Sequence, residues 1–264
     1  MTTTGTGQQS ASASDPTSDG RTFQDPKKYL LPNDKQEKER LAKQHPAARV
    51  TGIDIDSITP AITPVPSNCT FQSNIDAQDG PWSFAPDTKF DFVHFRMILS
   101  CFNQPTQVFR SVYENLAPGG YVEIQDLCVE IHSPDGSASG TSFEKIVDMF
   151  NQGSLKSGIS MTKSKNYKKW LQEIGFVDVE ERLAEPGLPT TGWHENERDR
   201  EIGEMGSVSI QTFIRKGMPA YLRAAGLDEA GLQELTEKAV AELKSGEVKA
   251  YYPFYVVYGR KPLD

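Results

Sequence analysis

The N-terminal part of the chain lacks glycine where a nucleotide-binding fold needs it. From Arg21 to Thr51 there is no glycine, and the earlier glycines lie in a Ser/Thr-rich stretch that no strand precedes. In a doubly wound α/β fold, the first strand runs into a glycine-rich turn, which lets backbone N–H groups approach the ligand closely. Either the ligand is therefore not a nucleotide, or a part of the usual site is absent.

Paired cysteines and an excess of basic charge are also lacking. The three cysteines, Cys69, Cys101 and Cys128, contain no CxxC pair, and an odd number fits poorly with a disulfide framework. A net charge of −8 argues against non-specific binding of nucleic acid, which requires clustered Lys and Arg. The one dense basic run, 162–170, has the spacing of a solvated helix face.

Long apolar runs and metal-binding pairs are missing as well. No run approaches the roughly 18 apolar residues of a membrane span, and no charged-then-apolar leader begins the chain. We therefore expect a cytoplasmic protein, with the nucleus as an alternative and no membrane partner. The four histidines are scattered without metal-ligand spacing, so we expect no metal site.

What is present begins with a polar tail. Residues 1–22 have almost no large apolar side chain, so they cannot offset the entropy lost on ordering, and we predict a disordered tail. Residues 23–264 are long enough to form a single domain with a substantial core.

Alternating strand and helix patterns follow from Arg49. Runs rich in β-branched and aromatic residues predict strands at 49–54, 69–75, 90–95 and 121–126. Between the last two strands, an apolar stripe predicts a helix that starts at Pro105 and stops before the Pro-Gly-Gly of 118–120. This rhythm predicts an α/β fold with a mainly parallel, Rossmann-like sheet.

After Asp126 the pattern becomes more helical. Helical stripes at 143–150 and 165–174 lead into a strand at 176–183, and a long helical stretch at 195–244 is broken near Gly217 and Gly226. A final strand is expected at 251–262. We interpret about 185–246 as a helical insertion before this strand, which is a common way to build a lid over a small-molecule pocket.

Two acids follow consecutive predicted strands. Asp54 ends the 49–54 strand, where a carboxylate can accept hydrogen bonds from both hydroxyls of a ribose. Asp76 follows the next strand, where it could accept from an adenine amino group. Acids at strand ends also cap loops, but two in succession favour a nucleotide-type ligand.

His94 and Arg96 lie near the end of the 90–95 strand, where open sheets place their ligands. His94 is a candidate general base, and Arg96 is a candidate for orienting a carboxylate or the cofactor. Both residue types also occur in strands as ordinary structural groups, and the sequence leaves these alternatives open.

Several motifs together resemble the class I S-adenosylmethionine-dependent methyltransferases, and more narrowly the LaeA-like methyltransferases of fungal secondary metabolism. The supporting segments are "YLLPND" (29–34), "GIDIDSITP" (52–60), "FDFVHFR" (90–96), "LAPGGYVEIQD" (116–126), "KKWLQEIGFVDVEER" (168–182) and "YYPFYVVYGRKP" (251–262). They run in family order over residues 23–262. The resemblance implies a sheet whose last strand is antiparallel.

The resemblance also implies a cofactor and a site. S-adenosyl-L-methionine would be bound by Asp54 and Ile55 at the ribose and by Asp76 and Ala77 at the adenine, with the segment from His94 to Arg96 facing a small-molecule substrate. The implied function is methyl transfer to a secondary metabolite. The alternative is a non-catalytic, methyltransferase-like partner in a regulatory complex. A nicotinamide-dependent dehydrogenase would share Asp54 but also needs the glycine turn.

The chain departs from this pattern at the segment missing after Leu41. By comparison with the family, the first strand, the glycine turn and most of the next helix are absent, on the order of 40 residues. The second and fourth strands of the family could then pair directly, giving the order 3-2-4-5-7-6. Alternatively, the recorded chain derives from a misread exon. The sequence leaves both explanations open.

Overall fold

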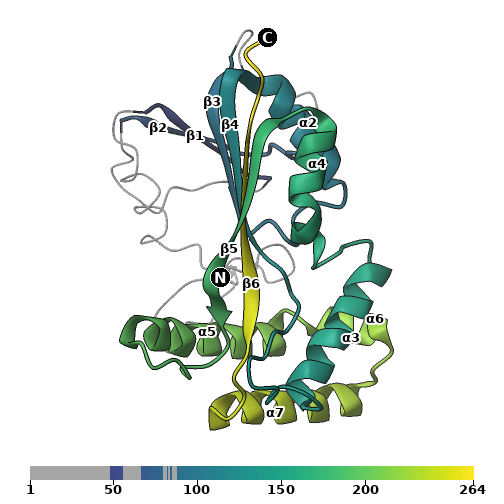
Figure 1. Cartoon of the computed structure of the whole chain (residues 1–264). Helices are drawn as coiled ribbons and strands as arrows, with labels where there is room; N and C mark the ends of the chain where they lie inside the picture. Colours follow the sequence, from purple (N-terminus) through teal and green to yellow (C-terminus); the bar gives the residue numbers. More distant parts are fainter. Residues whose placement is uncertain (1–47, 56–66, 80–81, 83, 85–87) are drawn as a thin grey trace, which may run out of the picture. The chain divides into compact units, whose positions relative to one another are not determined.

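The computed structural model describes residues 48–55, 67–79, 82, 84 and 88–264 (Figure 1). Residue contacts divide the chain into two compact units, residues 1–74 and residues 75–264, and each is described by itself. The predicted tail at 1–22 and the boundary after it lie outside the described residues.

The first unit contains a small parallel sheet. Strand β1 (Val50–Ile53) pairs with β2 (Cys69–Gln72), with Val50 opposite Cys69 and Ile53 opposite Gln72. These strands lie inside the predicted runs at 49–54 and 69–75. Asp54 follows β1 directly, so the structure places this carboxylate at the carboxyl end of a parallel strand, as the sequence predicted.

The second unit contains a four-stranded sheet in the order β3-β4-β6-β5. Its strands are β3 (Phe90–Arg96), β4 (Leu116–Leu127), β5 (Val177–Pro189) and β6 (Tyr251–Arg260). Strand β3 pairs with β4 in parallel, whereas β6 is antiparallel to both neighbours. The predicted Rossmann-like sheet with an antiparallel last strand is confirmed.

The described strands thus form two separate sheets. The direct pairing of the second and fourth family strands, which the sequence left open, would join β1 to β3. This pair is not among the hydrogen-bonded strands of the described residues.

One face of the four-stranded sheet packs against α2 (Pro105–Asn115) and α4 (Tyr167–Ile174), which follows the short 3₁₀ helix η1 (Lys163–Asn166). Helix α2 begins with proline in its first turn. The N–H that proline lacks would have no intrahelical acceptor at this position. Its predicted apolar stripe, including Val108, Phe109 and Val112, is completely buried against Val122 and Ile124 of β4. These side chains form the first core.

A second core lies at the other end of β6, where the helices gather in Figure 1. It is formed by α3 (Ser142–Lys156), α5 (Glu197–Lys216), α6 (Pro219–Ala225) and α7 (Glu229–Ser245). The last three helices lie between β5 and β6, and their breaks fall at Gly217 and Gly226 as expected. None of the described helices has the length and apolar character needed to span a membrane.

The close packing of α3 against α6 in this second core depends on a glycine. Gly153 of α3 lies against the backbone of Tyr221 in α6, and a Cβ atom added at Gly153 would come within 1.8 Å of the Tyr221 carbonyl oxygen. Because backbone atoms cannot give way as a flexible side chain can, the approach of α3 to α6 requires glycine at this position.

Candidate cofactor site

The first predicted site residues lie at the end of β1. The backbone N–H of Asp54 donates a 3.2 Å hydrogen bond to the carbonyl of Gln72, which extends the β1–β2 ladder by one residue. Ile55 is 60% exposed. The strand pairing therefore fixes the backbone on which the Asp54 carboxylate is carried.

The second predicted pair, Asp76 and Ala77, lies in a turn of the other unit. The Asp76 carboxylate accepts a 2.8 Å hydrogen bond through Oδ1 from the backbone N–H of Gln78, and the carbonyl of Ala77 accepts one of 2.9 Å from the indole of Trp82. Trp82 is itself buried in the first core. The turn is thus anchored by hydrogen bonds at both Asp76 and Ala77.

Gln78 connects this turn to the start of α2. Its side-chain oxygen accepts hydrogen bonds from the backbone N–H groups of Asn103 (2.9 Å) and Gln104 (3.2 Å), and its carbonyl accepts from the Gln107 side chain (3.2 Å). The side chain of Gln104, the N-cap residue, makes no capping bond of its own. Gln78 therefore caps α2 and ties the Asp76 turn to the loop that follows β3.

His94 and Arg96 both lie on β3, on the same side of the sheet because side chains alternate along a strand. Nδ1 of His94 is 3.1 Å from Oε1 of Glu123 on β4, and its ring stacks on Phe92. Arg96 lies opposite Gln125, which donates to Glu123. Glu123 thus gives His94 a carboxylate that can orient its ring. The same arrangement is found around general bases and in ordinary surface ion pairs.

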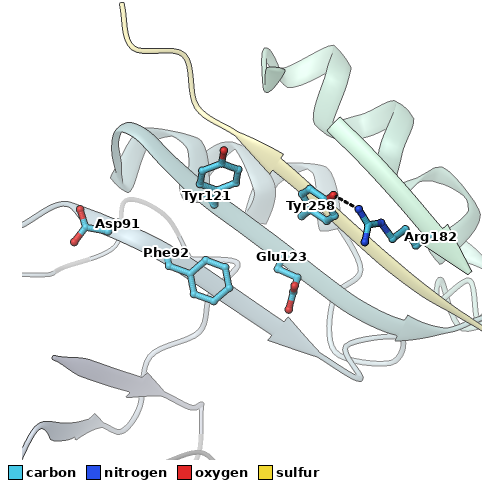
Figure 2. A pocket seen from close by; sticks show the side chains of 6 residues that line it. All are labelled: Asp91, Phe92, Tyr121, Glu123, Arg182 and Tyr258. Carbon is cyan, nitrogen blue, oxygen red and sulfur yellow. Dashed lines mark hydrogen bonds between the residues drawn. The ribbon is translucent and has the colours of Figure 1, made fainter. Parts of the chain in front are cut away.

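The same face carries an open depression, shown in Figure 2. It has a volume of about 540 Å³ and is lined by Asp91, Phe92, Tyr121, Glu123, Arg182 and Tyr258. Arg182 donates to the hydroxyl of Tyr258 (2.9 Å) and to Glu180 (3.0 Å), so its charge is already compensated. The predicted site residues of this unit, Asp76, Ala77, His94 and Arg96, are not among those that line this depression.

A buried polar cluster lies at the carboxyl end of β4, and sequence reasoning missed it. Asp126 is completely buried and accepts a 2.6 Å hydrogen bond from the hydroxyl of Tyr167 and one of 3.0 Å from the N–H of Leu127. Burial raises the pKa of Asp126 to about 6, against the opposing effects of Tyr167, the Leu127 N–H and Lys163. Lys163 is 3% exposed, and desolvation lowers its pKa.

A signal for this cluster was present in the sequence. Asp126 lies at the end of a predicted strand, as Asp54 and Asp76 lie at or just after the ends of theirs. The search for acids at strand ends would therefore have selected it as well. Its partners could not be found in this way, because Lys163 and Tyr167 come from a basic run that the sequence assigned to a solvated helix face. Within the described residues, no group of three or more His, Cys, Asp or Glu side chains could hold a metal ion.

Comparison with known proteins agrees with this arrangement. A family model described as "Methyltransferase domain" matches residues 35–181, which is more than half of the chain. In structure, the chain is similar to a cyclopropane-fatty-acyl-phospholipid synthase-like protein from Lactobacillus casei, with 14% identity over 83% of this chain and 78% of that one and a TM-score of 0.50. This second likeness concerns the fold alone.

Curated relatives come from fungi. The chain is 25% identical to the protein-methionine methyltransferase laeA of Emericella nidulans over 84% of its own length and 59% of that protein. It is 25% identical to the probable methyltransferase tdiE of the same fungus, over 84% of this chain and 68% of tdiE. It is 27% identical to the methyltransferase pytC of Aspergillus terreus, over 84% of this chain and 67% of pytC.

The chain thus spans about six-tenths of the length of laeA. The match of the family model to residues 35–181 leads to one conclusion: this chain belongs to the methyltransferase-domain family, whose cofactor is S-adenosyl-L-methionine.

Proposed function

We propose that the chain is an S-adenosylmethionine-dependent methyltransferase that acts on a small-molecule secondary metabolite of a fungus. The observation that carries the proposal is the anchored turn of Asp76 and Ala77, whose backbone is fixed by Gln78 and Trp82, in a chain of this family. The names of tdiE and pytC as methyltransferases support the activity, and the naming of a laeA relative as a secondary metabolism regulator supports the metabolic context.

The residues present fit the nucleoside part of the cofactor. Asp54 stands at the end of a parallel strand, where a carboxylate can accept from both ribose hydroxyls. Asp76 uses Oδ1 within its own turn, and Oδ2 is suited to accept from the adenine amino group. We propose Asp54, Ile55, Asp76 and Ala77 as the cofactor-binding residues.

Methyl transfer requires little covalent chemistry from the protein. S-adenosylmethionine, held by Asp54, Ile55, Asp76 and Ala77, would supply an electrophilic methyl group to a substrate oxygen, nitrogen or carbon. Holding the two reactants in line supplies much of the rate. We propose that His94, oriented by Glu123, accepts the substrate proton, and that Arg96 orients the substrate or the cofactor.

The same proposal covers the domain organisation of the chain and its cellular compartment. Residues 23–264 would act as one methyltransferase-like domain, with the helices of the insertion at about 185–246 as a lid over the substrate. The proposed compartment is the cytoplasm, where small metabolites and cofactor are both present. The nucleus is the alternative, in keeping with the regulator name of the laeA relatives.

A second candidate function is supported by one observation. The absence of glycine from Arg21 to Thr51 leaves no candidate for the turn that would contact the methionine end of the cofactor. A non-catalytic, methyltransferase-like protein that binds a partner in a regulatory complex would not need that turn.

Transfer of a labelled methyl group separates the two candidates. The full chain is incubated with methyl-labelled S-adenosylmethionine and a small-molecule extract of fungal mycelium, with heat-denatured chain as the control. The proposal predicts label in a chain-dependent small-molecule product. Label on protein only would contradict the substrate class, and no transfer by a folded chain would favour the non-catalytic partner.

A further inference from the structure

The loop between β3 and α2, residues 97–104, lies between the proposed adenine-binding turn and the buried cluster at the end of β4. On one side, Gln78 accepts from the N–H groups of Asn103 and Gln104. On the other side, the Lys163 ammonium donates a 2.8 Å hydrogen bond to the carbonyl of Phe102. The loop is therefore held by side chains from two separate segments.

Asp126 acts on the same loop. Besides Tyr167 and Leu127, the backbone of Leu99 stabilises its carboxylate, and the Lys163 charge attracts it. Lys163 is almost fully buried, where desolvation disfavours its charge, and the Asp126 carboxylate partly compensates this cost by electrostatic attraction. Removing the charge of Asp126 would leave Lys163 without that compensation and would loosen its hold on Phe102.

The loop also starts under strain. Met97 has a positive φ of 56°, which a non-glycine side chain rarely adopts, and its N–H donates a 2.8 Å hydrogen bond to the carbonyl of Gln125. Such a conformation is strained and persists only where the surroundings fix it. The cluster around Asp126 lies immediately beyond Gln125, so it can supply part of this restraint.

We propose that Asp126, together with Lys163 and Tyr167, is a positioning group that holds loop 97–104, and through Gln78 the Asp76 turn, in the conformation that binds the adenosine of the cofactor. This inference rests on the proposed function for its ligand. It concerns only residues of the second unit. None of the three residues needs to touch the cofactor, because each acts through the loop.

Ionised Asp126 is the form that attracts Lys163, so positioning should depend on pH. Its neighbours must be considered together: the titratable groups around it are Lys163 of η1, Tyr167 of α4, Cys101 of the loop, Cys128 next to β4, and Tyr255 opposite it on β6. Since the pKa of Asp126 is about 6, the carboxylate is ionised at neutral pH and becomes protonated under mildly acidic conditions.

The experiment compares the full chain with Asp126→Asn, Tyr167→Phe and Val147→Ala. Val147 is buried in the second core and makes none of the side-chain hydrogen bonds of the proposed network, so its truncation lowers stability without removing any of them. Two quantities are measured: the affinity for S-adenosylhomocysteine from pH 5 to pH 8, and the exchange rate of backbone amides in residues 97–104.

We expect Asp126→Asn to weaken binding at neutral pH by about tenfold, as for a lost charge-assisted contact. We expect faster exchange in the loop and a smaller effect of Tyr167→Phe. Wild-type affinity should fall as the pH is lowered through about 6, and the Asn variant should lack this step. Val147→Ala should leave affinity and loop exchange unchanged.

Equal affinities of Asp126→Asn and wild type would overturn the inference, as would equal losses in Asp126→Asn and Val147→Ala. If the wild-type chain itself does not bind, the proposed function fails, and loop exchange alone decides the positioning role. Unchanged exchange in Asp126→Asn and Tyr167→Phe would then refute it.

Discussion

The hydroxyl of Tyr167 donates a 2.6 Å hydrogen bond to Oδ2 of Asp126, and neither residue has any exposed surface. The bond joins α4 to the carboxyl end of β4, on the edge of the sheet where this fold class binds its ligands. It also accounts for the burial of residues from the basic run 162–170. Tyr167 donates to the buried carboxylate of Asp126, and Lys163 attracts this carboxylate electrostatically.

Tyr167→Phe should lower the free energy of unfolding by about 1.5 to 3 kcal/mol, because a buried hydrogen bond to a carboxylate is lost while the ring stays in place. Chemical denaturation at neutral pH measures the change. Tyr121→Phe is the matched control: its side chain is 40% exposed, so the expected change is within about 0.5 kcal/mol. Equal effects of the two substitutions would contradict this role of the hydrogen bond.

Asp126 should make stability depend on pH. Its pKa is raised from 3.8 to about 6 in the folded chain, so between these values the folded state binds more protons than the unfolded state. The stability that Asp126 contributes therefore falls as the pH rises from 3.8 to about 6, and it stays constant above.

Denaturation of wild type and Asp126→Asn across this range tests the prediction. The free energy of unfolding of wild type, relative to the Asn variant, should decrease by roughly 2.5 kcal/mol between pH 4 and pH 7. A difference that does not change with pH, or that increases, would show that the folded-state pKa of Asp126 is not raised.

Gly153→Ala should separate α3 from α6. A methyl group at this position would overlap the carbonyl of Tyr221, so the expected loss of stability is about 1 to 3 kcal/mol despite the better helix propensity of alanine. Thermal unfolding measures the loss. Gln152→Ala, at the exposed neighbouring position of the same helix, should change little, and a Gly153→Ala variant as stable as this control would refute the close approach.

Gln78→Leu should uncap α2. The N–H groups of Asn103 and Gln104 would lose their acceptor, which typically costs about 0.5 to 2 kcal/mol for a helix cap. The same variant should weaken binding of S-adenosylhomocysteine, because the Asp76 turn loses its link to α2. Gln172→Leu on the exposed side of α4 serves as the control for the added apolar surface, and it should alter neither quantity.

Much of the fold could be predicted from the sequence. The strand runs, the helix that begins at Pro105 and the breaks at Gly217 and Gly226 follow from local patterns, and the structure has each of them close to its expected position. Such features depend on residues near one another in the chain, and β-branched runs, proline and glycine report them reliably.

The features that were missed depend on contacts between distant segments. No pattern in the sequence around Lys163 indicates that it will be buried near Asp126, because helix α3 separates the two residues in the chain. Gln78 has no motif of its own, yet it caps a helix that starts at Pro105. The pairing of His94 with Glu123 likewise arises from the register of β3 and β4, which the sequence does not state.

The most direct test of the central claim is a calorimetric titration of the full 264-residue chain with S-adenosylhomocysteine, alongside Asp54→Ala, Asp76→Ala and, as a control in the same turn, Asp79→Ala. Our account predicts micromolar binding by wild type and Asp79→Ala, and a loss of affinity in the Asp54 and Asp76 variants. Absence of binding by a folded wild-type chain, or equal binding by all four proteins, would contradict it.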